Sequence, residues 1–289
     1  MRTMPSAGRR SELLARVFAL AAATLIAVTR PTHAQAGARD AILLRLHPHV
    51  GDTLRTRLEQ LTEITIGRAG TNPRPMMTTV TVLARTIVQA SLKATTTVLT
   101  MVDSADVQTS DARGGAMAAQ AERTLRGQQL VLQLAEDGTV EIARDARGSA
   151  VSREVTEAMA TMPAVFPHRP VAVGDRWQRE MPLVSANPLG GTGANAHVRA
   201  EFRLESLGRR GELAYVSMRG EIVPDDARRG PELTGRMTGE MKVDRRRGWM
   251  TDSRFSLIVV SLVAPPAAGM APMRFVTKVT QRLRTMDKW

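Results

Sequence analysis

The sequence has 289 residues, with 40 Lys and Arg against 28 Asp and Glu, a formal net charge of +12 and no cysteine. The lack of cysteine excludes a disulfide framework, a thiol nucleophile and a lipid-modified N-terminal cysteine. Only 3% of the residues are aromatic, which argues against a groove for single-stranded nucleic acid, because such grooves depend on aromatic stacking.

The N-terminal region has the pattern of a cleavable signal peptide. Residues 1–16 carry four arginines and one glutamate, and residues 17–28 form an apolar run. A helix needs about 20 apolar residues to span a bilayer, so this run is too short for a permanent anchor. Ala34-Gln35-Ala36 supplies the small residues of a cleavage site, with an alternative cut after Ala34. We therefore expect residues 1–36 to be removed from an exported protein, periplasmic or extracellular, without a transmembrane segment.

The exported protein stays basic. Residues 1–36 hold five Arg and one Glu, so their removal lowers the formal charge from +12 to +8. A basic surface favours anionic envelope polymers, lipid head groups or nucleic acid in general terms, without choosing between them.

Most of the remaining chain has the period-2 alternation of half-buried strands. Apolar and polar residues alternate, between Gly and Asp clusters, in Met77–Ala90, Thr96–Val102, Leu130–Ala135, Val198–Leu204, Ala214–Met218, Phe255–Val259 and Phe275–Leu283. This alternation is typical of antiparallel strands with one buried face. The sequence therefore predicts a mainly β (α+β) protein.

Three hairpins can be predicted from the requirement that apolar residues share a face. A three-residue loop with Gly138 in the left-handed position pairs Leu134 with Val140 and Leu132 with Ile142. The same requirement makes two further pairs, each across a longer loop that ends in glycine: Phe202 with Val216, and Val243 with Trp249.

Helical periodicity occurs mainly in two segments. Within 149–162, Val151, Val155, Met159 and Met162 recur at helical spacing, Ser149 can cap the start and Pro163 stops the helix. A shorter candidate runs from Gly115 to Leu125.

The order of landmarks suggests an internal duplication. Gly51-Asp52 recurs as Gly174-Asp175, each pair after a valine and before a candidate strand, and Leu-x-Gly recurs at 125–127 and 233–235. The alternative is chance, because both patterns are common in β proteins. Duplication predicts two related antiparallel curved sheets or half-barrels, over 37–147 and 170–289, with a helix and linker at 148–169 between them.

The motif Pro170-x-x-x-Gly174-Asp175-x-Trp177, with the early Gly51-Asp52 and the signal peptide, resembles an uncharacterised family of bacterial secreted or lipoprotein-like β-rich domains. The resemblance spans about residues 42–286. Members often carry a lipid-attachment cysteine, which this chain lacks. The half-barrel pattern is also similar to the envelope lipoprotein-carrier family, which implies a curved sheet that holds acyl chains around a helical lid.

The sequence offers no convincing catalytic or metal site. His47-Pro48-His49 could present two ligands, but no Asp, Glu or Cys stands beside it. The nucleophile-elbow and zinc-protease motifs are absent. Asp52 and Asp175 could act as an acid–base pair, but an Asp after Gly at a strand entry more commonly fixes the turn. We predict no enzymatic activity and no cofactor.

The remaining candidates concern partners and stability. Arg245, Arg246 and Arg247 form a charge cluster at a predicted hairpin tip, where they could contact anions or simply be solvated. Met159 and Met162 could line an apolar pocket, although ordinary core filling is the alternative. Gly51, Asp52, Gly174, Asp175 and Trp177 form the structural motif, with Trp177 expected to be buried.

These observations favour an exported non-enzymatic binding protein of the cell envelope, with an apolar or amphipathic ligand between curved sheets. Two alternatives remain open: a structural or protein-interaction component of the envelope, and an enzyme without a recognised motif.

Overall fold

The computed structural model describes residues 41–68, 73–111, 114–146, 165–183, 196–224, 232–263 and 272–287. Residues 39–289 form a compact unit of their own. The expected signal peptide and the helix expected at 149–162 lie outside the described residues, so both stay predictions, as does the division into domains.

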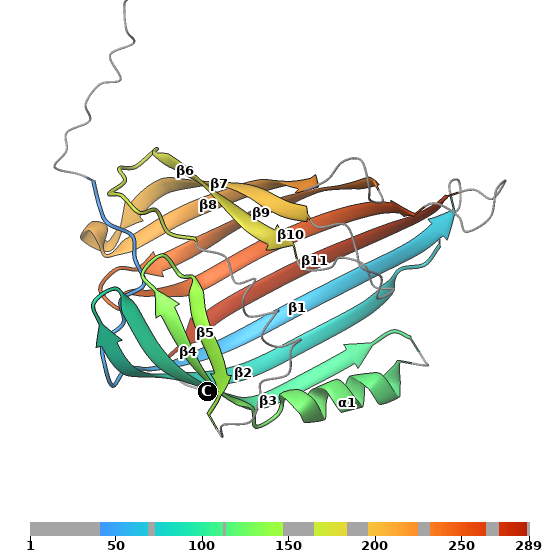
Figure 1. Ribbon diagram of the computed structural model, residues 1–289, viewed down its shortest axis with the longest axis horizontal. Coiled ribbons are helices and arrows are strands. Elements are labelled where there is room, and N and C mark those ends of the chain that lie inside the picture. The colour runs from blue at the N-terminus through green and yellow to red at the C-terminus, as the bar shows by residue number, and fades with distance from the viewer. Residues whose placement is uncertain are drawn as a thin grey trace, which may run out of the picture. The chain divides into compact units, whose positions relative to one another are not determined.

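All eleven strands belong to one antiparallel sheet, in the order β5-β4-β3-β2-β1-β11-β10-β9-β8-β7-β6 (Figure 1). The elements are β1 (Thr53–Arg68), β2 (Met76–Leu92), β3 (Thr95–Thr109), α1 (Gly115–Leu125), β4 (Gln129–Ala135), β5 (Val140–Asp145), β6 (Arg176–Leu183), β7 (Ala196–Gly208), β8 (Leu213–Pro224), β9 (Glu232–Asp244), β10 (Trp249–Val263) and β11 (Met273–Met286). The predicted mainly β fold is confirmed, and so is the helix expected from Gly115 to Leu125.

The two halves, predicted as two related curved sheets or half-barrels, form one curved sheet, because β1 and β11 pair along their length. Their register runs from Arg55 opposite Met286 to Arg68 opposite Met273. Each half is a meander in which sequential strands are neighbours, β1 to β5 and β6 to β11. The pairing of the first strand with the last joins the two meanders edge to edge into one sheet.

Two glycines on the inward face of β9 lie close to the backbone of β10. A Cβ on Gly239 would lie 2.5 Å from the Arg254 carbonyl oxygen, and one on Gly235 would lie 2.2 Å from the Ile258 carbonyl oxygen. Real Cβ atoms do not approach so closely, so the observed packing of β9 against β10 requires glycine at both positions.

Two of the hairpin predictions are wrong in register, one because of a bulge and the other because of the position of its turn. In β4–β5, Leu134 faces Val140 as predicted and Gly138 has φ +92°, but Leu132 faces Ala143, since Glu141 is an extra residue. In β7–β8 Val216 lies opposite Leu204 rather than Phe202, because the turn is formed by residues 209–212 and not by the predicted 207–211; the bulge at Glu205 offsets this shift by only one residue.

The third hairpin, β9–β10, also differs by one residue. Met250, not Trp249, lies opposite Val243, because the turn contains four residues, 245–248, where the prediction required five.

The core gathers at the end of the sheet where β1 and β6 begin. Its fully buried side chains come from strands far apart in the sheet, including Val88, Val98, Phe202, Leu204, Val216 and Val243. They form one cluster on the inward face, which is therefore the concave face of the curved sheet.

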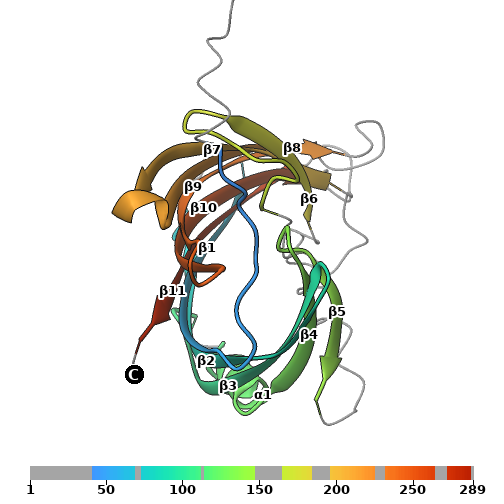
Figure 2. The same ribbon diagram turned by 90° about the vertical axis from the view of Figure 1, so that its left-hand side faces the viewer.

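Residues 41–48, here called the strap, cross the concave face at this end (blue in Figure 2). Burial alternates strictly along the strap, with Ile42, Leu44, Leu46 and Pro48 buried and the residues between them exposed. We call this end of the sheet the strap end.

Candidate functional site

The two Gly-Asp pairs occupy matching strand entries. Gly51 has φ +90° and Gly174 has φ +93°. The Gly51 N–H donates to the Val88 carbonyl at 2.9 Å, and the Gly174 N–H donates to the Leu204 carbonyl at 2.7 Å. Each glycine thus connects the turn before β1 or β6 to the neighbouring strand, β2 or β7.

The aspartates fix these turns and take no part in a shared site. The Asp52 carboxylate accepts the His49 N–H at 3.1 Å, and the Asp175 carboxylate accepts the Ala172 N–H at 3.0 Å. Each carboxylate closes its own turn by a hydrogen bond three residues back. The acid–base reading is therefore unsupported, while the prediction that Gly51-Asp52 and Gly174-Asp175 are equivalent strand entries is confirmed.

Trp177 is buried, as predicted. It is 8% exposed, its ring stacks on Phe202 with centroids 5.7 Å apart, and its indole N–H donates to the Val165 carbonyl at 2.8 Å. Trp177 and Phe202 face each other across β6 and β7. The ring therefore anchors the edge strand β6 and the segment before it to the core.

A charged cluster that the sequence did not indicate lies between the two edges of the sheet. Arg179 faces inward from β6 and donates hydrogen bonds to the Phe166 carbonyl and to His168 Nε2, the latter at 2.9 Å. Its guanidinium lies 3.8 Å from the carboxylate of Asp137, in the β4–β5 turn, and both side chains are less than 20% exposed.

The backbone repeats this connection between the edges. The Val165 and Phe166 N–H groups both donate to the Asp137 carbonyl, at 2.9 and 3.1 Å. Residues 165–168 thus link β6 to the β4–β5 hairpin. We call Asp137, Arg179 and these residues the clasp.

The strap binds three separated parts of the strap end. Ile42 exchanges two backbone hydrogen bonds of 2.8 Å with Val171, the Leu46 N–H donates to the Glu136 carbonyl, and the His47 N–H donates to the Gly248 carbonyl. Gly248 must be glycine there, because a Cβ would lie 2.1 Å from the His47 carbonyl oxygen. The alternation of Ile42, Leu44 and Leu46 with exposed residues was a readable sequence signal for the strap.

The candidate binding face is the inward face of β1, β2, β10 and β11 beyond the core. Their registers place the charged residues of these four strands outward, except Arg68 at the far end of β1, and the outward set includes Glu63, whose carboxylate pairs with Lys278 at 2.9 Å. The inward positions hold apolar residues, Thr, Ser and Gln. Half-buried examples are Leu58, Gln60, Thr62, Ile64, Ile66, Val80, Val82, Phe255, Leu257, Val279, Gln281 and Leu283.

The other predicted site residues are scattered. Arg245, Arg246 and Arg247 are exposed in the β9–β10 turn, at the strap end and away from the uncharged face. Met159 and Met162 lie outside the described residues. Three further methionines on inward positions, Met218, Met237 and Met241, are buried in the core.

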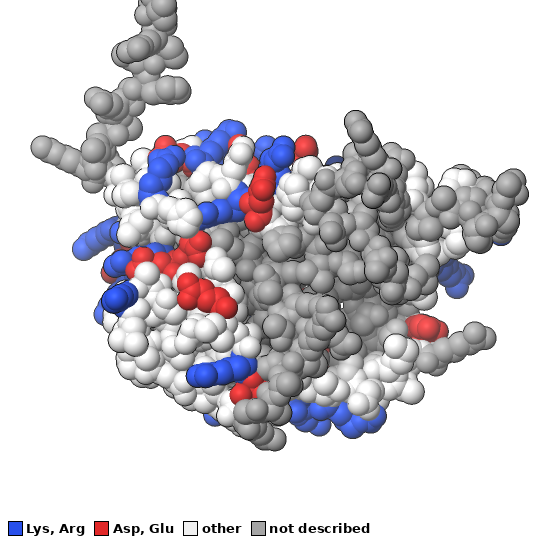
Figure 3. Space-filling model, viewed as in Figure 1, with Lys and Arg blue, Asp and Glu red and all other residues white. Residues whose placement is uncertain are grey.

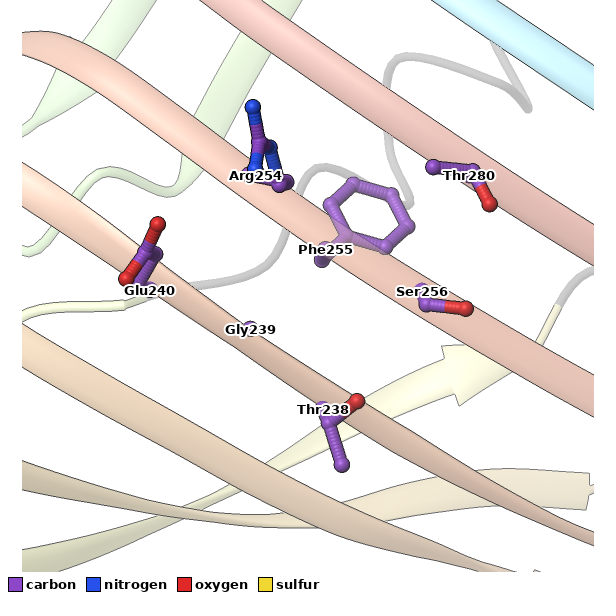
Figure 4. A pocket seen from close by; sticks show the side chains of 7 residues that line it. All are labelled: Thr238, Gly239, Glu240, Arg254, Phe255, Ser256 and Thr280. Atoms are coloured by element: carbon purple, nitrogen blue, oxygen red, sulfur yellow. The ribbon is translucent and has the colours of Figure 1, made fainter.

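Two shallow hollows lie on the part of the surface that can be described. One, of about 240 Å³, lies across three strands: Thr238, Gly239 and Glu240 of β9, Arg254, Phe255 and Ser256 of β10, and Thr280 of β11 (Figure 4). Ligand pockets usually measure about 300–1,000 Å³, so this hollow is small for a ligand site. The second lies between turns at the strap end.

Within the described ranges, no three His, Cys, Asp or Glu side chains come together as a metal site. None of the helices in those ranges combines the length and the apolar character that a membrane span requires.

No protein-family model matches the chain, and no curated protein matches it. Among solved structures, the chain is similar to DynF from the dynemicin biosynthesis pathway of Micromonospora chersina, with 9% identity, 88% of each chain covered and a TM-score of 0.22. It is also similar to an outer membrane channel from Pseudomonas putida F1, with 10% identity, 86% of this chain and 99% of that chain covered and a TM-score of 0.19. A third similarity is to OpdL from Pseudomonas aeruginosa, with 10% identity, 83% and 99% coverage and a TM-score of 0.21. TM-scores of this size carry no argument about function.

Proposed function

We propose that this chain is an exported, non-enzymatic binding protein of the cell envelope, which holds an apolar or amphipathic ligand against the inward face of β1, β2, β10 and β11. The observation that carries the proposal is the segregation of charge on these strands. Apart from Arg68, where β1 ends, their charged side chains point outward, while the other inward positions beyond the core are uncharged and incompletely buried. The proposed export to the cell envelope rests on the basic N-terminal region and the short apolar run that follows it in the sequence.

The inward face has the chemistry that an amphipathic molecule requires. Leu58, Ile64 and Leu283 offer apolar surface, whose burial against a ligand stabilises the complex by about 25 cal/mol per Å². Gln60 and Gln281 lie opposite each other on β1 and β11. Their amides can donate to or accept from a polar group of the ligand.

The proposal can be tested with two threonines of the same strand. Thr62 faces inward on β1 and Thr65 faces outward, and both are half buried. Thr62→Lys places a charge against the ligand, which is costly without a partner, whereas Thr65→Lys adds the same charge to a face that is already charged. Binding would be measured with N-phenyl-1-naphthylamine as an uncharged fluorescent probe, beside lipid extraction and mass spectrometry of protein purified from its own host.

We expect Thr62→Lys to weaken probe binding about tenfold or more and Thr65→Lys to leave it within about twofold, since one charged group taken out of water costs several kcal/mol. Equal effects of the two substitutions, or no probe binding by the unaltered protein, would remove the support for this face.

A second candidate function, as a structural or interaction component of the envelope, is favoured by a different observation. Ile258, Val260 and Leu262 of β10 and Val276 of β11 occupy neighbouring outward positions and are half buried. An apolar group on the outer face of a sheet is a feature of protein contacts. Cross-linking in the native envelope that captures a partner through Val260, with no extractable ligand, would favour this function over the first.

A further inference from the structure

Two neighbouring turns at the strap end gather four exposed arginines. The β7–β8 turn, which contains η1 (Arg209–Gly211), supplies Arg209 and Arg210, and the β9–β10 turn supplies Arg245 and Arg246. We call these four residues the arginine surface. In Figure 3 basic side chains gather along the left-hand edge, which is the strap end in Figure 1.

Contacts between the two turns hold the arginine surface together. The Arg245 N–H donates to the Glu212 carbonyl at 2.8 Å, and its guanidinium donates to the Gly211 carbonyl at 2.5 Å. A hollow of about 260 Å³ lies between the turns, lined by Arg210, Gly211, Glu212, Arg245 and Arg246. The two pairs of arginines are more than 30 residues apart in the sequence, so only the pairing of β8 with β9 brings them into one surface.

The backbone of the β7–β8 turn shows that arginine is a poor choice there for folding alone. Arg209 has φ +47° and Arg210 has φ +57°. Two successive side chains in the left-handed region are unfavourable, and Gly or Asn would relieve the strain. The charges of Arg209 and Arg210 thus stand at positions where the turn itself gains nothing from arginine.

The acidic residues nearby leave a net positive charge on the arginine surface. The Asp244 carboxylate accepts the backbone N–H groups of Arg246 and Arg247, both at 3.0 Å. Arg247 pairs with Asp287 at 3.0 Å and is therefore left out of the arginine surface. Glu212 is the acid that lines the same hollow.

Exposed aliphatic side chains project from other turns of the same end. Val50 is 60% exposed, Val173 is 54% exposed and Leu92 is 74% exposed. Val50 and Val173 precede the matching glycines at the starts of β1 and β6, and Leu92 ends β2 next to the β2–β3 turn. Because sequential strands are antiparallel, these turns share the strap end with the arginine surface.

We propose that the strap end docks on an anionic lipid bilayer, with the arginine surface on the head groups and Val50, Leu92 and Val173 entering the interface. Basic side chains near anionic lipid and aliphatic tips in the interface are the two contributions from which peripheral membrane binding is built. A soluble polyanion would use the arginines but would give the aliphatic tips no apolar phase. The inference does not depend on a ligand at the inward face.

The test compares two triple variants with the same loss of charge. The first is Arg209→Asn, Arg210→Asn and Arg246→Ser, which keeps Arg245 because of its bond to Gly211. The control is Arg123→Ser, Arg219→Ser and Arg274→Ser, three exposed arginines outside the strap-end turns. A third variant, Val50→Ser, Leu92→Ser and Val173→Ser, removes the aliphatic tips.

Binding would be measured by sedimentation with phosphatidylcholine vesicles, with and without about 30% phosphatidylglycerol, at about 50 and 500 mM salt. The melting temperature of each variant would be recorded.

We expect binding only to the vesicles with phosphatidylglycerol, weaker at high salt, and reduced about tenfold or more by the first triple variant. The control should stay within about twofold, and the aliphatic variant should lose binding at both salt concentrations. No binding to anionic vesicles, or a loss in the first variant no greater than in the control, overturns the proposal. The proposal is also overturned if the aliphatic variant binds vesicles normally and the unaltered protein binds soluble polyphosphate as tightly as it binds vesicles. The arginine surface would then be a site for polyanions.

Discussion

Trp177 connects the edge strand β6 to the neighbouring strand β7 and to the segment that precedes β6. Its indole stacks on Phe202 of β7, and its N–H reaches the Val165 carbonyl before β6. Arg179, two residues later on the same inward face, reaches Asp137 across the gap between the sheet edges. The edge strand β6 is therefore held by its inward side chains as well as by its hydrogen bonds to β7.

We expect Trp177→Ala to cost about 3–5 kcal/mol of unfolding free energy, because it removes a packed ring and leaves the Val165 carbonyl without its donor. For a chain of this size that loss corresponds to a fall of roughly 10 °C in the melting temperature. The matched control is Val173→Ala, four residues earlier in the same turn region and 54% exposed, which should change stability by less than about 0.5 kcal/mol. Equal falls for the two variants would contradict the anchoring role of Trp177.

At the level of elements, the strap stabilises the core without joining the sheet. The strap forms two backbone hydrogen bonds with Val171 and one each with Glu136 and Gly248, and every second side chain of the strap is buried. Its apolar residues cover core side chains that the sheet leaves uncovered at this end. An extended segment can do this because its alternate residues point the same way.

The strap makes Gly248 and Gly51 an informative pair. Both have positive φ, at +59° and +90°, but a Cβ would clash with the His47 carbonyl at Gly248 and would meet nothing within 4 Å at Gly51. We expect Gly51→Ala to cost about 1 kcal/mol, the strain of the left-handed conformation alone. Gly248→Ala should cost clearly more and should displace the strap.

Limited trypsin digestion reports the displacement, since Arg45 lies within the strap and its side chain is 44% exposed. Cleavage after Arg45 should be faster in Gly248→Ala than in Gly51→Ala. The same rate in both variants would mean that the strap does not depend on close contact with Gly248.

At the level of the whole molecule, the two meanders share one core. Val88 and Leu132 of the first half and Phe202 and Val243 of the second belong to a single buried cluster. The pairing of β1 with β11 and the clasp close the two junctions between the halves. The matching Gly-Asp turns agree with a duplication, but the halves are not independent in their packing.

Expressed separately, residues 37–147 and 170–289 should therefore lack a cooperative unfolding transition, because each half exposes its side of the shared core and an unpaired long strand. Co-expression of the two fragments should restore a cooperative transition, measured by circular dichroism during thermal unfolding. The full chain serves as the reference. Cooperative unfolding of either fragment alone would show that the halves have separate cores.

The sequence by itself determined the β class, the Gly-Asp turns, the helix from Gly115 to Leu125 and the burial of Trp177. These features depend on neighbours within a few residues, such as the period-2 alternation and the turn preferences of Gly and Asp. The register of the hairpins did not follow, because the extra residue Glu141 resembles an ordinary strand residue and the turns at 209–212 and 245–248 are shorter than the predicted loops.

Only the tertiary structure decided how the parts combine. The β1–β11 pairing joins residues 205 to 231 positions apart along the chain, from Arg68–Met273 to Arg55–Met286, and a single alternating strand carries no signal for which distant edge it will meet. The clasp of Arg179 with Asp137, the contact of Gly248 with the strap, and the meeting of Arg209 and Arg210 with Arg245 and Arg246 have the same origin. Each depends on which strands pair and how the sheet curves, and no local sequence pattern specifies these.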